Sequence, residues 1–144
     1  MAVKEEEQRV WQRVMDRDQP EQSGLRQLAI QTQQAASQYR RLLKSRVESH
    51  RELGKQLMST ELENLAALKG LHYMQTGKSL KLPPQTPMMW DTRQLQGQYH
   101  IARRMLSEYT ARSAEPEWGC IFLAMAKRQE QQCDRLCRLM GHMQ

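Results

Sequence analysis

Aromatic residues are scarce in this 144-residue sequence: they make up 6% of it, and phenylalanine occurs once. β-Branched residues are also few, whereas Leu, Ala, Met, Gln, Arg and Glu dominate. Strands favour β-branched and aromatic side chains, while the dominant residues here are good helix formers. The composition therefore predicts an all-α protein, and the length is sufficient for one domain with its own core.

Long apolar runs are missing, and cysteines are few. No run approaches the roughly 18 apolar residues of a spanning helix, so no membrane association is expected. The three cysteines are Cys120, Cys133 and Cys137. An odd number without a signal peptide predicts reduced thiols and a cytoplasmic location. Cys133 and Cys137 lie four residues apart, and we expect them to pack as small apolar side chains rather than to form a redox pair.

Negative charge is in the minority: 22 lysines and arginines stand against 16 aspartates and glutamates, which gives a net charge of +6. Much of the excess lies in one stretch, at Arg40, Arg41, Lys44, Arg46 and Arg51. Such a run is most often a solvated helix face, and an acidic partner is the alternative. We expect no nucleic-acid partner, because single-strand binders also present exposed aromatics for stacking.

The first half of the sequence predicts a leader helix followed by the first two helices of a domain. Residues 1–19 hold a leader helix at Val3–Arg17, with acidic residues in its first turn and a short apolar stripe. A domain of residues 20–144 follows. Its first helix, Leu25–Val47, has apolar or small residues every three to four positions. The next helix begins at a capping box formed by Ser49 and Glu52, after a tight turn at residues 46–49, and runs to about Gln75 with Gly77 behind it.

The segment Lys78–Trp90 separates the two halves of this domain. It has thirteen residues, three of them proline, so it cannot be helical. Extended, it spans roughly 40 Å, at about 3.3 Å per residue. A helix of about 25 residues is roughly 37 Å long, so the segment can traverse the whole bundle. We therefore expect a four-helix bundle with one long crossover, as in ferritin-like folds.

Two further helices are expected after the crossover. Asp91 caps the third, with Gln94 three residues later. The fourth begins at Pro116, because proline is favoured at the first helical position, and Gly141 ends it. Each helix again carries an apolar stripe at helical spacing.

Three stretches of the sequence resemble a known family. They are Ala35 to Tyr39 (AxxxY), Gly70 to Gly77 (GLHYMQTG) and Ser107 to Gly119 (SEYTARSAEPEWG). Together they make residues 25–141 similar to the small rubrerythrin-like, ferritin-like proteins of anaerobic bacteria. In that family, two helices each supply one glutamate and the other two each supply Glu-x-x-His. These six side chains hold two irons in the bundle core.

The resemblance places six positions of this chain where the family has its iron ligands. They are Thr32, Glu61, Asn64, Ala102, Gln129 and Gln132. The same positions lie within the apolar stripes, so periodicity also predicts that they point inward. One carboxylate with neutral amides cannot balance the charge of two iron ions. We expect no metal there, and instead a hydrogen-bond network around Glu61.

The leading functional hypothesis is therefore a ferritin-like protein that has lost its di-iron ligands. It would be a structural or protein-interaction module without catalytic residues or cofactors, and it would associate with itself or with another protein. The alternative is a metal-binding ferritin-like oxidoreductase or metal-storage protein, with iron or manganese at a residual site around Glu61.

Overall fold

The computed structural model describes residues 24–85 and 92–142, and the secondary structure in these ranges is helical, with no strand. The first helix spans residues 24–40 and continues into a short 3₁₀ helix, η1 (Arg41–Lys44). Three longer helices follow: α2 (Glu48–Thr76), α3 (Thr92–Arg112) and α4 (Gly119–His142). The predicted all-α protein with four helices is confirmed. The predicted leader helix in residues 1–19 and the predicted Asp91 cap lie outside the described residues.

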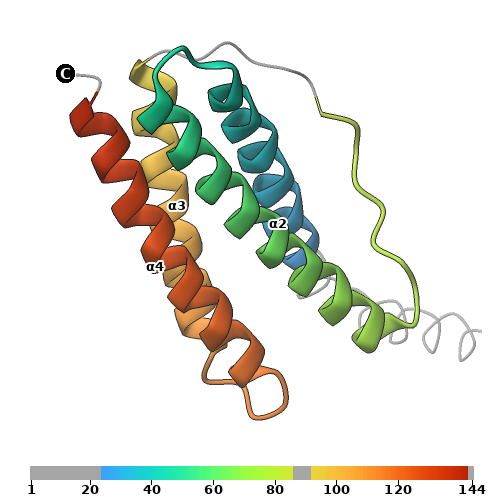
Figure 1. Cartoon of the computed structure of the whole chain (residues 1–144). Coiled ribbons are helices and arrows are strands. Elements are labelled where there is room, and N and C mark those ends of the chain that lie inside the picture. The colour runs from blue at the N-terminus through green and yellow to red at the C-terminus, as the bar shows by residue number, and fades with distance from the viewer. Residues whose placement is uncertain (1–23, 86–91, 143–144) are drawn as a thin grey trace, which may run out of the picture.

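The helices lie side by side with their axes roughly aligned (Figure 1). The first helix and α2 are antiparallel, α3 runs in the same direction as α2, and α4 runs against both. Helix α4 packs against α3 and α2, and η1 packs against α2. After α2, residues 77–85 turn back along the outside of the helices (Figure 1). There Leu80 and Leu82 pack against the core, and Gln85 Nε2 donates a hydrogen bond to Gln33 Oε1 at 3.4 Å.

The turn between the first two long helices differs from the prediction. The predicted helix to Val47 is wrong at its end, because the α-helix stops at residue 40 and Ser45 is already extended. The predicted capping box is also wrong. Val47 occupies the N-cap of α2, and no side chain caps the helix. Instead, Ser45 Oγ accepts a hydrogen bond from Val47 N at 3.2 Å, and Arg51 Nη1 donates one to Ser45 O at 2.8 Å.

The end of α2 follows the prediction. Gly77 adopts a left-handed conformation, with φ of 71°, and its amide donates to Tyr73 O at 2.7 Å. Glycine adopts this conformation without a steric penalty, so it stops the helix. Thr76 Oγ1 then accepts a hydrogen bond from Lys78 N at 3.1 Å, which directs the chain away from the helix axis.

The start of α4 lies three residues later than predicted. Residues 116–118 form a turn, so Pro116 is not the first helical residue, and α4 begins at Gly119. The reason is a close approach of two backbones: a Cβ at Gly119 would lie 2.4 Å from Ser113 O. Gly119 N donates to Glu115 O at 2.9 Å and closes this loop. At the other end, α4 includes Gly141 and extends to His142, one residue beyond the predicted stop.

The core consists of two apolar clusters. One contains residues of the first helix before position 30, the second half of α2, the end of α3 and the start of α4. The other contains residues 35–42, the first half of α2, the start of α3 and the end of α4. In the first helix, α2 and α4, the residues between the two clusters are polar and buried: Thr32, Glu61, Asn64, Gln129 and Gln132. We call these five residues the polar layer.

Candidate functional site

The polar layer occupies the middle of the bundle. The six positions singled out in the sequence are all buried: none has more than 2% of its surface exposed. Ala102 contributes only its backbone to the layer, because its side chain has no polar atom. The other five belong to three different helices, so the sequence expectation that they point inward agrees with their burial.

Asn64 and Gln129 connect α2 to α4 and α3. Asn64 Nδ2 donates a hydrogen bond to Gln129 Oε1 at 3.3 Å. Gln129 Nε2 in turn donates to the carbonyl oxygen of Ala102 at 3.2 Å. Each amide therefore uses a donor and an acceptor inside the bundle, which removes the penalty of burying an unpaired polar group.

Gln132 connects α4 to α2. Its Nε2 donates to Leu57 O at 2.7 Å and to Glu61 Oε1 at 3.2 Å. Glu61 Oε2 is buried and has no hydrogen-bond partner among the described residues. Burial raises the pKa of Glu61 from 4.5 to about 7, and the hydrogen bond from Gln132 opposes this only in part. Near neutral pH the carboxyl group therefore holds a proton in a large fraction of molecules.

Thr32 links the first helix to α3. Its Oγ1 donates to Leu28 O at 2.7 Å and lies 3.4 Å from the hydroxyl of Tyr109. Burial raises the pKa of Tyr109, and the hydrogen bond with Thr32 opposes that rise. Burial likewise raises the pKa of Tyr39, and the neighbouring charge of Glu61 adds to the effect. Both phenols therefore stay neutral at neutral pH, and that of Tyr109 shares a hydrogen bond with Thr32.

Two arginines of α4 close the layer on its outer side, and the sequence reasoning missed both. Arg128 Nε donates to Asn64 Oδ1 at 2.8 Å and lies 3.7 Å from Glu63 Oε2. Arg135 Nη1 donates to Thr60 Oγ1 at 2.8 Å and to Gln132 Oε1 at 3.1 Å. The seven-residue spacing of Arg128 and Arg135 could have indicated that both lie on the same face of α4, because residues seven apart share one helix face.

The donor set does not fit a di-iron centre. Such a centre needs several anionic oxygens and imidazoles, and the polar layer offers a single carboxyl group whose pKa is raised to about 7. Among the described residues, no three His, Cys, Asp or Glu side chains lie close enough to share a metal ion. The guanidinium groups of Arg128 and Arg135 donate hydrogen bonds to Asn64 and Gln132 within the layer. These cations would repel a metal ion.

The cysteines lie outside this layer. Cys133 belongs to an apolar cluster, whereas Cys120 and Cys137 are exposed. Burial raises the pKa of Cys133 to about 11, so its thiol is protonated at neutral pH. The thiolate is the reactive form of cysteine, so the Cys133 side chain packs as a small apolar residue, as predicted. The same prediction for Cys137 is wrong, because that side chain is exposed.

Comparison of the chain with protein-family models, with curated proteins and with solved structures finds no match. In residues 24–85 and 92–142, no helix combines the length and the apolar character needed to cross a membrane.

Proposed function

We propose that this chain is a ferritin-like four-helix bundle that works without metal, as a structural or protein-interaction module. The parallel direction of α2 and α3 supports the ferritin-like assignment (Figure 1). Helices that run in the same direction need a connection along the bundle, and one such connection distinguishes ferritin-like folds from up-down-up-down bundles. The long non-helical stretch after Gly77 is suited to that path.

The observation that carries the proposal is the hydrogen bonding of the polar layer. The positions that would hold iron in a di-iron relative carry amides, a hydroxyl and one carboxyl group. Their donors are used by Ala102 O, Leu57 O and Glu61 Oε1, so the layer ties α2, α3 and α4 together directly. A buried polar network of this kind stabilises one arrangement of the helices without a metal ion.

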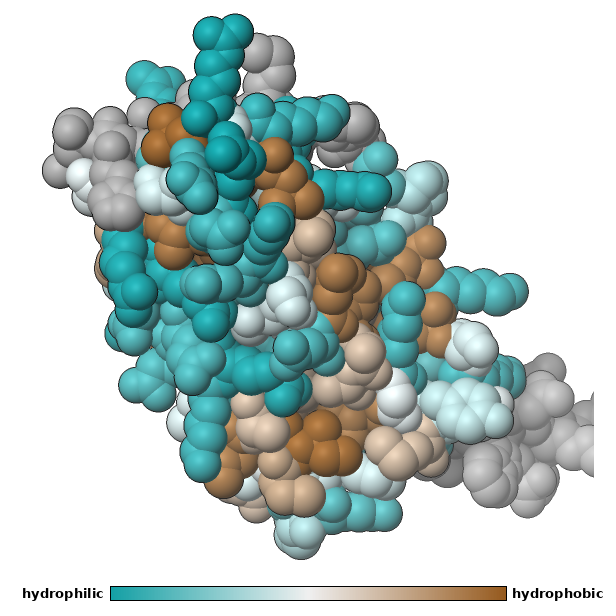
Figure 2. Space-filling model, in the orientation of Figure 1, coloured by the Kyte–Doolittle hydropathy of each residue, from teal (hydrophilic) through white to brown (hydrophobic). Residues whose placement is uncertain are grey.

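The interaction part of the proposal is supported by exposed apolar side chains on neighbouring helices. Leu62, Tyr73 and Met74 of α2 and Leu123 of α4 each expose between 47% and 59% of their surface. Apolar side chains gather over the lower half of the α2 and α4 face in the space-filling view, while the upper part of α4 is hydrophilic (Figure 2). A second copy of this chain is the partner that we assign to this face, since an exposed apolar patch favours association.

A comparison of ferrous iron binding in two proteins tests the proposal. The first is the wild-type chain. The second restores the family ligands through five substitutions: Thr32→Glu, Asn64→His, Ala102→Glu, Gln129→Glu and Gln132→His. We expect iron to leave the thermal midpoint of the wild type unchanged. The restored variant should gain about 2.7 kcal/mol of stability at an iron concentration of about 100 times its Kd.

The restored variant with Glu61→Gln added is the control, and it should lose most of this gain. Two outcomes would count against the proposal. If the wild type is stabilised by iron, and Glu61→Gln abolishes the effect, the chain keeps a metal site. If the restored variant folds but binds no iron, the positions do not converge as they do in ferritin-like proteins.

A further inference from the structure

A cavity of about 680 Å³ lies between the first helix, the segment 77–85 and α3, away from the polar layer. Its volume is within the usual range for small-molecule sites, about 300–1,000 Å³. Its described lining includes Arg40, Arg41 and Lys44 at the end of the first helix and in η1, Pro83 and Pro84 of the outer segment, and Ile101 of α3. Sequence reasoning had treated the basic residues among them as a solvated face.

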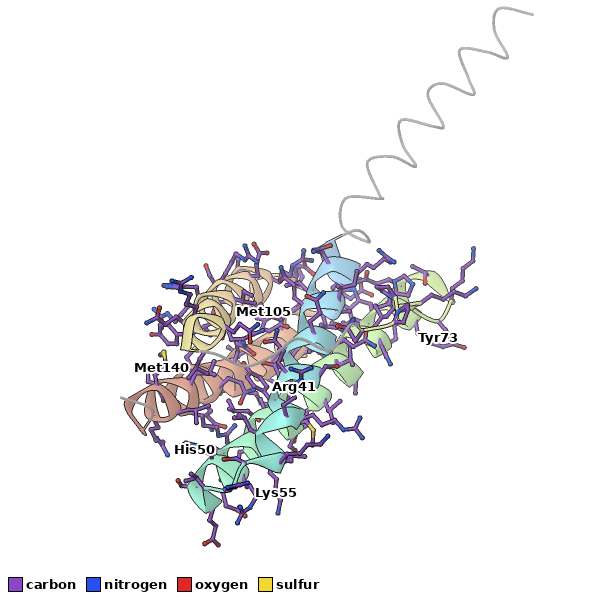
Figure 3. The ribbon with its side chains drawn as sticks, turned by 90° about the horizontal axis from the view of Figure 1, so that it is seen from above. Arg41, His50, Lys55, Tyr73, Met105 and Met140 are labelled. Carbon is purple, nitrogen blue, oxygen red and sulfur yellow. The ribbon has the colours of Figure 1, made fainter. Side chains whose placement is uncertain are left out.

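The charged residues that the structure describes at the cavity all have the same sign. Arg40, Arg41 and Lys44 line it together, and no acidic residue is among the described lining residues. None of the three cations makes a salt bridge within the described residues. Arg41 is half-buried, and it lies over the middle of the molecule in the view from above, whereas Lys55 and Tyr73 lie at the edge (Figure 3).

The end of the first helix does not cancel this charge. Carbonyl groups at a helix C-terminus act as roughly half a negative charge, and basic side chains are often placed there for that reason. Three full positive charges exceed that half charge several-fold. The cavity therefore has a positive potential that is available to a ligand.

The remaining walls divide into a polar part and an apolar part. Gln98 is buried, and its Nε2 donates a hydrogen bond to Gln38 Oε1, which fixes both amides. Ser37 and Gln34 add further polar groups on the first helix. Pro83 and Pro84 of the outer segment, with Ile101 of α3, form the apolar part. Proline carries no amide donor, so that side can cover an apolar group without leaving a polar atom unpaired.

We propose that this cavity binds a small organic anion, with a phosphate or carboxylate group held by Arg40, Arg41 and Lys44 and an apolar body against Pro83, Pro84 and Ile101. Arginine binds both kinds of oxyanion with paired hydrogen bonds, which accounts for the adjacent arginines. The proline segment forms one wall of a hollow of limited volume, which favours a small molecule over a polymer, because a polyanion needs an extended basic surface. The proposal does not depend on the absence of metal from the polar layer.

Isothermal titration calorimetry with three probes tests this site. Phenyl phosphate and benzoate each combine an anionic group with an apolar body, whereas inorganic phosphate lacks the apolar body. We expect phenyl phosphate to bind with a Kd of about 1 mM or tighter, from typical binding efficiencies per atom. Inorganic phosphate should bind at least about fivefold more weakly, because the buried area is lost. A stronger response to benzoate than to phenyl phosphate would assign the site to carboxylates.

The matched variants carry two substitutions each. Replacing both cavity arginines (Arg40→Gln with Arg41→Gln) should weaken phenyl phosphate binding about tenfold or more, since each removes a charge-assisted hydrogen bond. The control (Arg26→Gln with Arg93→Gln) removes two exposed charges outside the lining, and it should change the Kd less than about twofold.

A titration of the wild type at raised salt concentration needs no variant. Salt should weaken the binding of phenyl phosphate, because it screens the attraction between the anion and the basic side chains. The proposal is overturned if neither organic anion binds at about 10 mM, or if the two double variants weaken binding equally. It is also overturned if a 20-nucleotide RNA binds at the arginine pair while phenyl phosphate does not, since the surface would then recognise polyanions.

Discussion

Replacing Glu61 with glutamine should raise the free energy of unfolding by about 3 kcal/mol at pH 8.5 and leave it nearly unchanged at pH 4.5. Burial raises the pKa of Glu61 from 4.5 to about 7 in the folded chain, whereas the unfolded chain has no such burial. Between these two values the folded state binds one more proton than the unfolded state, so stability falls as pH rises. One pKa unit corresponds to about 1.36 kcal/mol, which sets the size of the expected loss. Glutamine has nearly the same shape, stays neutral and can still accept the hydrogen bond from Gln132.

Urea unfolding followed by far-UV circular dichroism at five pH values between 4.5 and 8.5 measures this effect. Glu63→Gln is the matched control on the same helix. Its carboxylate is 60% exposed and lies 3.7 Å from Arg128, so its loss should change stability by less than about 1 kcal/mol. If the free energy of unfolding changed with pH in the same way for the wild type and for Glu61→Gln, ionisation of Glu61 would not destabilise the folded chain, which would contradict this prediction.

The second large effect is expected at Gly54, where α2 approaches the end of the first helix. A Cβ at this position would lie 2.6 Å from Leu42 Cβ and 3.3 Å from Tyr39 O. Both atoms are fixed to the backbone, so the helices must separate. Gly54→Ala should therefore lose about 2 kcal/mol of stability from overpacking, even after the gain of up to about 1 kcal/mol in helix propensity.

Gly70 provides the comparison within the same helix. No atom lies within 4 Å of a Cβ built there, so Gly70→Ala should stabilise the chain by up to about 1 kcal/mol. The two alanine variants should thus differ by about 3 kcal/mol in urea unfolding. Equal effects of the same sign would mean that the first helix and α2 do not meet at Gly54.

Hydrophobic periodicity located most of the buried face of each helix. Residues such as Leu57, Leu68, Met125 and Leu136 repeat at helical spacing, and all of them are fully buried. The same periodicity predicted that the residues of the polar layer point inward, because they interrupt the apolar stripes in phase with them. Burial follows from position on a helix, so a sequence pattern is sufficient to find it.

Helix boundaries and cross-chain contacts were harder to predict. The Ser49 capping box failed because Ser45 makes the turn instead, and that choice depends on how closely η1 packs against α2. Arg128 and Arg135 meet Asn64 and Thr60 across some 64 to 75 residues of sequence. The basic cavity likewise forms only when segment 77–85 lies beside the first helix. Such features depend on tertiary packing, for which local sequence carries little signal.

A crystal structure of the chain purified without added metal or chelator, with anomalous data at the iron and manganese edges, tests the central claim most directly. We predict no anomalous peak among Thr32, Glu61, Asn64, Gln129 and Gln132, and amide hydrogen bonds donated by Asn64 to Gln129 and by Gln132 to Glu61. A peak at about 2.0–2.2 Å from a Glu61 carboxylate oxygen would contradict the account.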